Sequence, residues 1–121
     1  MATTKQFFYR IDGSNNPISV AVRIIKDPGT ILLNLDQKQI GNISDNVFPN
    51  TIIGDNSDLK GKTLVIFTNI FDFDPEDNNA SVEVTLTGGI RDRVIDEPVV
   101  ISNEDSVFLV FFISFIQPNL P

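Results

Sequence analysis

The sequence contains no cysteine, histidine or tryptophan, and its nine basic residues are outnumbered by sixteen acidic ones among 121 residues. Without histidine or cysteine the chain cannot form catalytic triads or dyads built on those side chains, the usual zinc sites, haem or iron–sulfur ligation, or any disulfide. Stability must therefore come from packing alone. A domain of this size can fold without disulfides in the cytosol or in the extracellular space, so their absence does not identify the cellular compartment.

Long hydrophobic runs are also scarce. Residues 1–6 lack the apolar segment of a secretory signal. The longest apolar stretch, Val107 to Ile116, is about half of the ~20 residues that a membrane helix needs. We therefore expect a soluble chain with no membrane span and no N-terminal signal peptide, cytoplasmic by default.

Positive charge is the next deficit, since the formal net charge is −7. Residues 1–60 carry six acids and six bases, whereas residues 61–121 carry ten acids and three bases. An acidic domain without a basic stripe is repelled by phosphate, which argues against nucleic acid. The partners we expect are another protein or a second copy of the chain, a glycan, or a cation.

The residues that are abundant point to β-structure. The chain has 16 Ile, 11 Val and 10 Phe against 3 Ala and 4 Glu, an excess of the β-branched and aromatic residues that suit strands. Twelve Asn and twelve Asp supply residues that favour turns. A length near 120 residues is typical of one domain, so we expect a single domain over residues 1–121.

Alternating apolar residues and turn signals predict about eight strands. The nine candidate segments for them are residues 6–11, 18–25, 30–35, 39–44, 50–54, 62–73, 80–87, 99–101 and 107–116, of which the fourth and fifth are the weakest. The pattern favours an all-β fold, a single antiparallel β-sandwich of jelly-roll or C2-like type, with a small β-barrel as the alternative.

Three local expectations accompany this architecture. Asp27-Pro28-Gly29 has the residues of a type II turn, which predicts a hairpin between the second and third strands. Residues 62–73 are apolar on both faces and should form a central strand. A two-residue hairpin at Gly88-Gly89 would place two arginines on an apolar face, so a longer loop or a bulge should follow through Arg93.

An acidic segment after the long strand is the candidate metal site. Asp72, Asp74, Glu76 and Asp77 offer the carboxylate oxygens that Ca²⁺ prefers, although the turn lacks the glycine of an EF-hand loop. Asp12 or the polar residues 103–105 could add ligands if their loops reach the same end of the fold. The alternative is a solvated turn whose charge prevents edge pairing. No other cofactor is expected.

Arg91 and Arg93 interrupt the acidity of the second half and form a candidate partner-binding loop. Guanidinium groups bind carboxylates through paired hydrogen bonds, so the loop could hold an acidic group of a partner. The alternative is local pairing with Asp92, Asp96 and Glu97, which would contribute little.

The last predicted strand is apolar on both faces. Val107, Leu109, Phe111, Ile113 and Phe115 share one face, and Phe108, Val110, Phe112, Ser114 and Ile116 share the other. Because a two-layer sandwich has one interior, the outer row needs cover from a loop or the N-terminal segment, a partner or second subunit, or an apolar ligand. The candidate interface residues are Phe108, Phe112 and Ile116 on one side, or Phe111 and Phe115 on the other.

We therefore expect a non-enzymatic structural or protein-interaction module that self-associates through its apolar C-terminal strand. The alternative is a β-sandwich that binds a glycan or lipid in a calcium-dependent way through residues 72–79. A small hydrolase using two carboxylates is a third possibility, because that chemistry needs no histidine.

Overall fold

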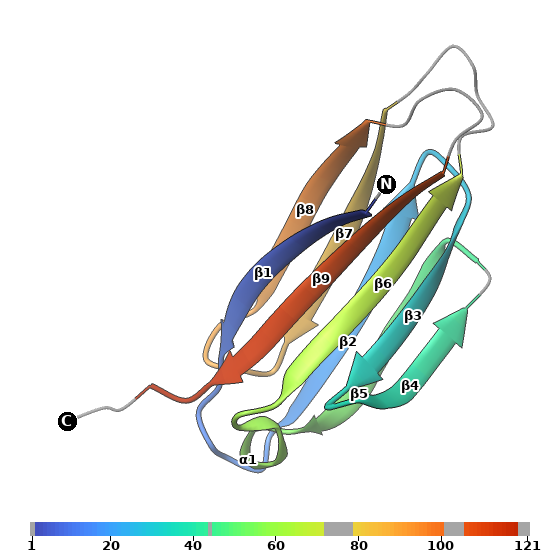
Figure 1. Cartoon of the computed structure of the whole chain (residues 1–121). Helices are drawn as coiled ribbons and strands as arrows, with labels where there is room; N and C mark the ends of the chain where they lie inside the picture. Colours follow the sequence, from blue (N-terminus) through green and yellow to red (C-terminus); the bar gives the residue numbers. More distant parts are fainter. Residues whose placement is uncertain (1, 44, 72–78, 101–105, 119–121) are drawn as a thin grey trace.

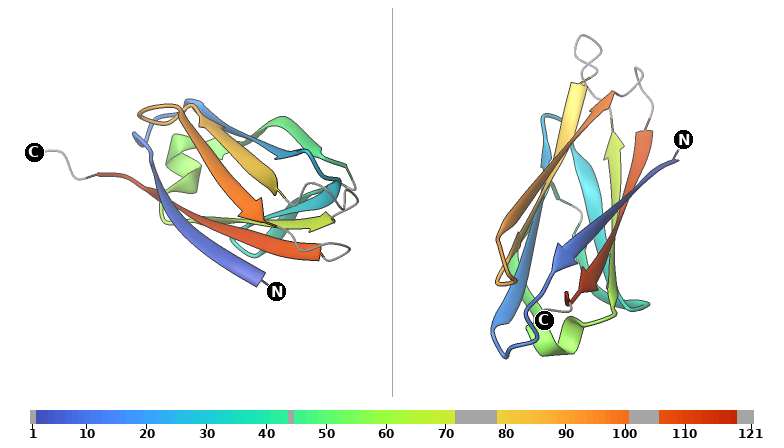
Figure 2. Two further views of the ribbon diagram at one scale, coloured as in Figure 1. Left: turned by 90° about the horizontal axis from the view of Figure 1, so that it is seen from above. Right: turned by 90° about the vertical axis from the view of Figure 1, so that its left-hand side faces the viewer.

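The computed structural model describes residues 2–43, 45–71, 79–100 and 106–118. These residues form nine strands and one helical turn, arranged as two sheets packed face to face (Figure 1, Figure 2). The elements are β1 (Ala2–Arg10), β2 (Pro17–Ile25), β3 (Gly29–Leu35), β4 (Lys38–Ile43), β5 (Val47–Asp55), α1 (Asn56–Leu59), β6 (Thr63–Phe71), β7 (Asn79–Thr87), β8 (Arg93–Val100) and β9 (Ser106–Ile116). The predicted all-β sandwich is confirmed. The alternative barrel is wrong, because neither sheet closes on itself.

The two sheets differ in size. Sheet A has five strands in the order β1-β9-β6-β3-β4, and sheet B has four in the order β5-β2-β7-β8. All pairings are antiparallel except that of β1 with β9, which is parallel. The expectation of a purely antiparallel sandwich is therefore wrong at one edge. Side-chain alternation reveals which residues share a face but says nothing of strand direction.

The core lies between the sheets and is built from the inward row of each strand. In β2 the alternating residues Ile18, Val20, Val22 and Ile24 are buried, as the sequence predicted. The long predicted strand becomes β6, which lies between β9 and β3 and is therefore central. The inward rows of β7 and β9 complete a single apolar cluster. Packing of this kind accounts for a stable fold without disulfides.

The hairpin predicted at Asp27-Pro28-Gly29 is wrong. β2 belongs to sheet B and β3 to sheet A, so the turn carries the chain from one sheet to the other. Both strands have an apolar row, and each row faces the shared core from its own sheet. Gly29 sits where a Cβ would come within 2.5 Å of the Asn69 carbonyl oxygen, which explains a glycine at this crossing.

The loop predicted after Gly88-Gly89 is confirmed up to residue 92, whereas Arg93, which was expected to belong to it, begins β8. The loop covers residues 88–92, and pairing of β7 with β8 begins at Leu86 and Arg93. Gly88 has φ +97°, and a Cβ there would overlap the Pro17 carbonyl oxygen. Strands β5 and β8 are longer than the short segments predicted at residues 50–54 and 99–101, because Pro49 and Pro98 occur within edge strands.

A buried asparagine ties three segments together at one end of the sandwich. Asn56 is fully buried at the start of α1. Its Nδ2 donates to the carbonyl oxygens of Asn16 and Gly88, each at 2.9 Å, and its Oδ1 accepts from the Asp12 amide at 2.9 Å. These bonds fix the position of the β7–β8 loop, which matters for the pocket considered below. In the described part of the chain, no helix has the length and apolar character needed to cross a membrane.

Candidate functional site

The outward-facing side of sheet A carries several exposed or partly exposed apolar side chains. We call it the outer face of sheet A. Its members alternate with the buried residues of each strand and lie in register across it. They are Thr4, Gln6, Phe8 and Arg10 of β1; Ser106, Phe108, Val110, Phe112, Ser114 and Ile116 of β9; Thr63, Val65, Phe67, Asn69 and Phe71 of β6; Thr30, Leu32 and Asn34 of β3; and Gln39 and Asn42 of β4.

Strand β9 decides which predicted interface residues are available. Phe111 and Phe115 are 0% and 1% exposed and belong to the core cluster, so the interface assignment of these two residues is wrong. Phe108 and Ile116 are 44% and 38% exposed on the opposite row, and Phe112 is partly exposed between them. Alternation along the strand makes this an either/or choice, since one row must fill the core.

Neighbouring strands extend the apolar row of β9 into a patch. Phe67 on β6 lies opposite Val110, and Leu32 on β3 lies opposite Phe67. Val110 is only 9% exposed although it lies outside the core cluster, so its outer-face neighbours already shield it. Phe8 on β1 is 60% exposed beside this row. The sequence signal for Phe8 is its alternation with the inward-facing Phe7 and Tyr9.

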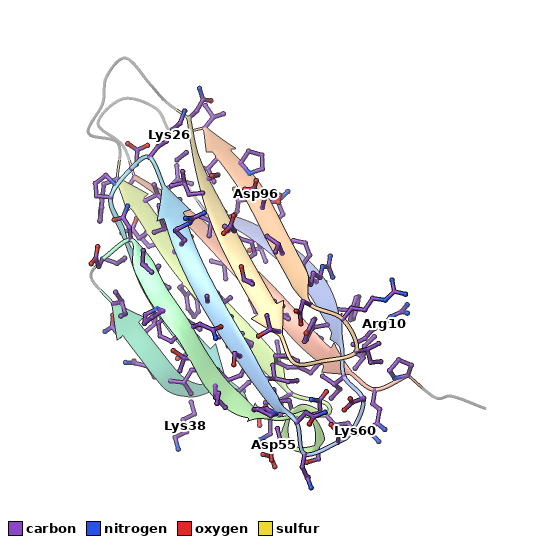
Figure 3. All side chains as sticks on the ribbon, turned by 180° about the vertical axis from the view of Figure 1, so that it is seen from behind. Arg10, Lys26, Lys38, Asp55, Lys60 and Asp96 are labelled. Atoms are coloured by element: carbon purple, nitrogen blue, oxygen red, sulfur yellow. The ribbon has the colours of Figure 1, made fainter. Side chains whose placement is uncertain are left out.

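Over its described rows the outer face of sheet A carries one formal charge, that of Arg10. Its polar members are threonine, serine, asparagine and glutamine, and Arg10, opposite Ile116, stands at one end. Sheet B is different: Arg23 and Glu83 form an ion pair of 3.2 Å on its outer surface, and Asp96 lies on β8 (Figure 3). The negative charge of this −7 protein is therefore carried elsewhere than on the described rows of the outer face of sheet A.

None of the described segments crosses the outer face of sheet A (Figure 1). The N-terminal segment, which the sequence offered as cover, instead becomes strand β1 and extends the sheet sideways from β9. Cover by the N-terminal segment is therefore wrong. Pairing with β9 is the reason, because it places β1 in the plane of the sheet.

The predicted calcium ligands Asp72, Asp74, Glu76 and Asp77 lie outside the described residues, as do residues 103–105. Asp12 is described: its Oδ1 accepts from the Ser14 amide at 2.9 Å, and the hydrogen bonds from Ser14 lower the pKa of its carboxyl group. Among the residues that the structure describes, no three acidic side chains converge as metal ligands would. The calcium site stays a prediction.

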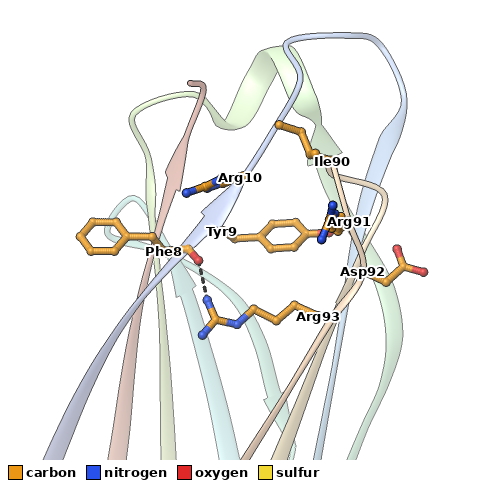
Figure 4. A pocket seen from close by; sticks show the side chains of 7 residues that line it. All are labelled: Phe8, Tyr9, Arg10, Ile90, Arg91, Asp92 and Arg93. Carbon is orange, nitrogen blue, oxygen red and sulfur yellow. Dashed lines mark hydrogen bonds between the residues drawn. The ribbon is translucent and has the colours of Figure 1, made fainter. Parts of the chain in front are cut away.

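The predicted partner-binding loop is well defined. Arg93 donates from Nη1 to the Phe8 carbonyl oxygen at 2.7 Å, and its guanidinium lies 5.3 Å from the centre of the Phe7 ring. Arg91 is exposed on the β7–β8 loop. Both arginines line a surface pocket of about 480 Å³ together with the end of β1 (Figure 4). The third arginine of the pocket is Arg10. The sequence did not predict that it joins the other two, because it lies 81 residues away from Arg91 in the chain.

The local pairing offered as the alternative for this loop is not what forms. Asp92 accepts a hydrogen bond from the Gly88 amide at 3.3 Å, and Glu97 pairs with Lys5 of β1 at 3.3 Å. Asp96 is exposed on the far side of β8. The arginines are therefore not neutralised by these three carboxylates.

Comparisons with known proteins add no relative from which a function could be transferred. The chain matches no family model, no curated protein and no solved structure.

Proposed function

We propose that this protein is a non-enzymatic structural module that self-associates through the outer face of sheet A. The observation that carries the proposal is a continuous apolar patch on a sheet face whose one described charge, Arg10, lies at its end, in a protein of net charge −7. Large exposed apolar patches of this kind mark interaction sites in folded proteins. Phe8, Phe108 and Ile116 are its most exposed apolar members.

Charge favours a second copy of this chain as the occupant. Two molecules of net charge −7 repel each other, and the repulsion is smaller when they meet through a face that carries no acidic residue in its described rows. The polar side chains of the face, such as Gln6, Asn34 and Asn42, are hydroxyls and amides that both donate and accept hydrogen bonds. Such groups are self-complementary, as a symmetric dimer interface requires.

The size of the face is suitable for a dimer. Five strands spaced about 4.8 Å apart and roughly nine residues long cover about 24 by 30 Å, or about 700 Å². A stable interface of standard size buries about 800 Å² on each partner. Complete burial of a large apolar side chain contributes roughly 1.5 to 3 kcal/mol, and three such side chains on each copy are only partly covered in the monomer.

Sedimentation velocity or light scattering over a wide concentration range tests the proposal. The wild-type protein should form dimers or larger assemblies, and Phe108→Ser should weaken association by about tenfold or more, since removal of an aromatic side chain that is buried on association costs over 1 kcal/mol. Ile52→Ser is the matched control, because Ile52 is 63% exposed on sheet B.

Two results would refute self-association through this face. One is a protein that remains monomeric at the highest attainable concentration. The other is an assembly that Ile52→Ser weakens as much as Phe108→Ser. Thermal melts of the variants should show that both remain folded, since the two side chains are exposed.

A further inference from the structure

Three of the four arginines in the sequence line a single pocket, which we call the arginine pocket. It lies where the end of β1 meets the β7–β8 loop, at the side of the sandwich, and it borders the outer face of sheet A at Phe8 and Arg10 (Figure 4). Its lining residues are Phe8, Tyr9, Arg10, Ile90, Arg91, Asp92 and Arg93. A third of the nine basic residues of this acidic protein therefore lie around the arginine pocket.

The positive charge of the pocket is not balanced by nearby carboxylates. In the described parts of the chain, Arg10, Arg91 and Arg93 form no ion pair, whereas Arg23 pairs with Glu83. Asp92 is the only acid of the lining, and its side chain points away from the arginines in Figure 4. Because guanidinium groups stay charged at any physiological pH, the pocket keeps its positive charge.

Hydrogen bonds hold the two walls of the pocket in place. The Ile90 amide donates to the Arg10 carbonyl oxygen at 3.0 Å, and the Gly89 amide donates to the Tyr9 hydroxyl oxygen at 3.0 Å. Arg93 adds its bond to the Phe8 carbonyl oxygen. A Cβ on Gly89 would meet the Arg10 carbonyl oxygen at 2.5 Å, so glycine is needed for this close approach. A preformed pocket loses little ordering entropy when it binds a ligand.

We propose that the arginine pocket binds a small ligand that carries one oxyanion, a carboxylate or phosphate, attached to an apolar group. Guanidinium groups bind both anions through paired, charge-assisted hydrogen bonds. The side chain of Ile90 is 44% exposed and the edge of the Tyr9 ring borders the cavity, so an apolar group would have partners beside the arginines. A volume of about 480 Å³ suits a small molecule. Polyanions are disfavoured, because the rest of the protein would repel them.

Nuclear magnetic resonance of the arginine Nε–H groups provides a direct test, because four arginines give four side-chain signals. The probes are benzoate and phenyl phosphate, with neutral benzamide as the control and sodium chloride used to hold the ionic strength constant. We expect saturable shifts of the Arg10, Arg91 and Arg93 signals with at least one of the two anions, and none with benzamide. The tighter of the two anions identifies the oxyanion that the pocket prefers.

Matched variants separate a site from a general effect of charge. Arg91→Gln removes an exposed pocket arginine that makes no hydrogen bond in the described structure, and should weaken binding about tenfold, as expected for loss of one charge-assisted contact. Arg23→Gln removes the same charge from sheet B and should leave binding unchanged.

The proposal is overturned if neither anion produces saturable shifts, if the Arg23 signal shifts as strongly as the others, or if Arg23→Gln weakens binding as much as Arg91→Gln. Inorganic phosphate that binds as tightly as phenyl phosphate would refute the apolar part of the ligand. None of these outcomes depends on self-association, which is measured separately by sedimentation.

Discussion

Tyr9 is the only tyrosine of the chain, and its environment gives a residue-scale prediction about pH. The side chain is 2% exposed, and its ring packs edge-on against Phe115. Burial raises the pKa of the Tyr9 phenol above its ordinary value; the negative charge of Asp92 adds to the increase, and the hydrogen bond from the Gly89 amide opposes it. The neutral form is therefore the one that fits the folded protein.

A raised pKa makes the folded state bind the phenol proton more tightly than the unfolded state. The contribution of Tyr9 to the free energy of unfolding should be constant below about pH 10. It should fall as the pH rises through the pKa of the folded state, because the phenol of the unfolded chain ionises first. Since the chain has no tryptophan, the phenolate absorbance band should report Tyr9 directly, with a midpoint above about 10.

Urea unfolding of the wild type and of Tyr9→Phe between about pH 8 and 11 isolates this contribution, because the lysines titrate in both proteins. The wild type should lose more stability with rising pH than Tyr9→Phe. Equal slopes for the two proteins, or a phenolate midpoint at the ordinary value, would contradict the effect of burial.

At the scale of elements, the sequence predicted which strands exist better than how they connect. Alternation identified the inward rows of β2 and β7 and the central position of β6. A strand that is buried on one face has apolar residues at every second position, and a strand that is buried on both faces has them at most positions. The crossing at Asp27-Pro28-Gly29 and the parallel pairing of β1 escaped prediction. A turn sequence fixes local backbone geometry, but the choice between a hairpin and a crossing depends on which sheet offers a place for the next strand.

For the candidate sites too, the sequence predicted local features better than contacts between distant segments. The sequence shows that both faces of β9 are apolar. It does not show whether Phe111 or Phe112 faces outward, because either row could fill a core. Arg91 and Arg93 were selected because they break the run of acids. Arg10 joins them only through the meeting of β1 with the β7–β8 loop, a contact between segments far apart in the chain.

The segment between β6 and β7 carries the calcium prediction. If Asp72, Asp74, Glu76 and Asp77 bind Ca²⁺, millimolar calcium should raise the melting temperature, because binding at tenfold above Kd stabilises a protein by about 1.4 kcal/mol. Asp74→Asn should abolish this shift. Asp36→Asn, a substitution on an exposed turn between β3 and β4, should preserve it. No shift in the wild type, or equal shifts in both variants, would remove the calcium-dependent function.

At the scale of the whole molecule, the uneven distribution of charge gives the two proposed sites opposite responses to salt. Association through the outer face of sheet A brings together two molecules of net charge −7 through a face without acidic residues in its described rows, so the charges on the rest of each molecule repel. Salt screens that repulsion over a Debye length of about 10 Å at 0.1 M and about 3 Å at 1 M. Binding of an anion to the arginine pocket is an attraction between opposite charges, which the same screening weakens.

Raising sodium chloride from about 0.05 to 0.5 M should therefore strengthen self-association while it weakens binding of phenyl phosphate, each by roughly severalfold. Lowering the pH toward the isoelectric point of about 4.3 should also strengthen association, because it reduces the net charge of each copy. Sedimentation and titration of the same sample measure both responses. An association that weakens as salt is added would mean that ion pairs hold the copies together, and the outer face of sheet A, which has no acidic residue in its described rows, could not then be the interface.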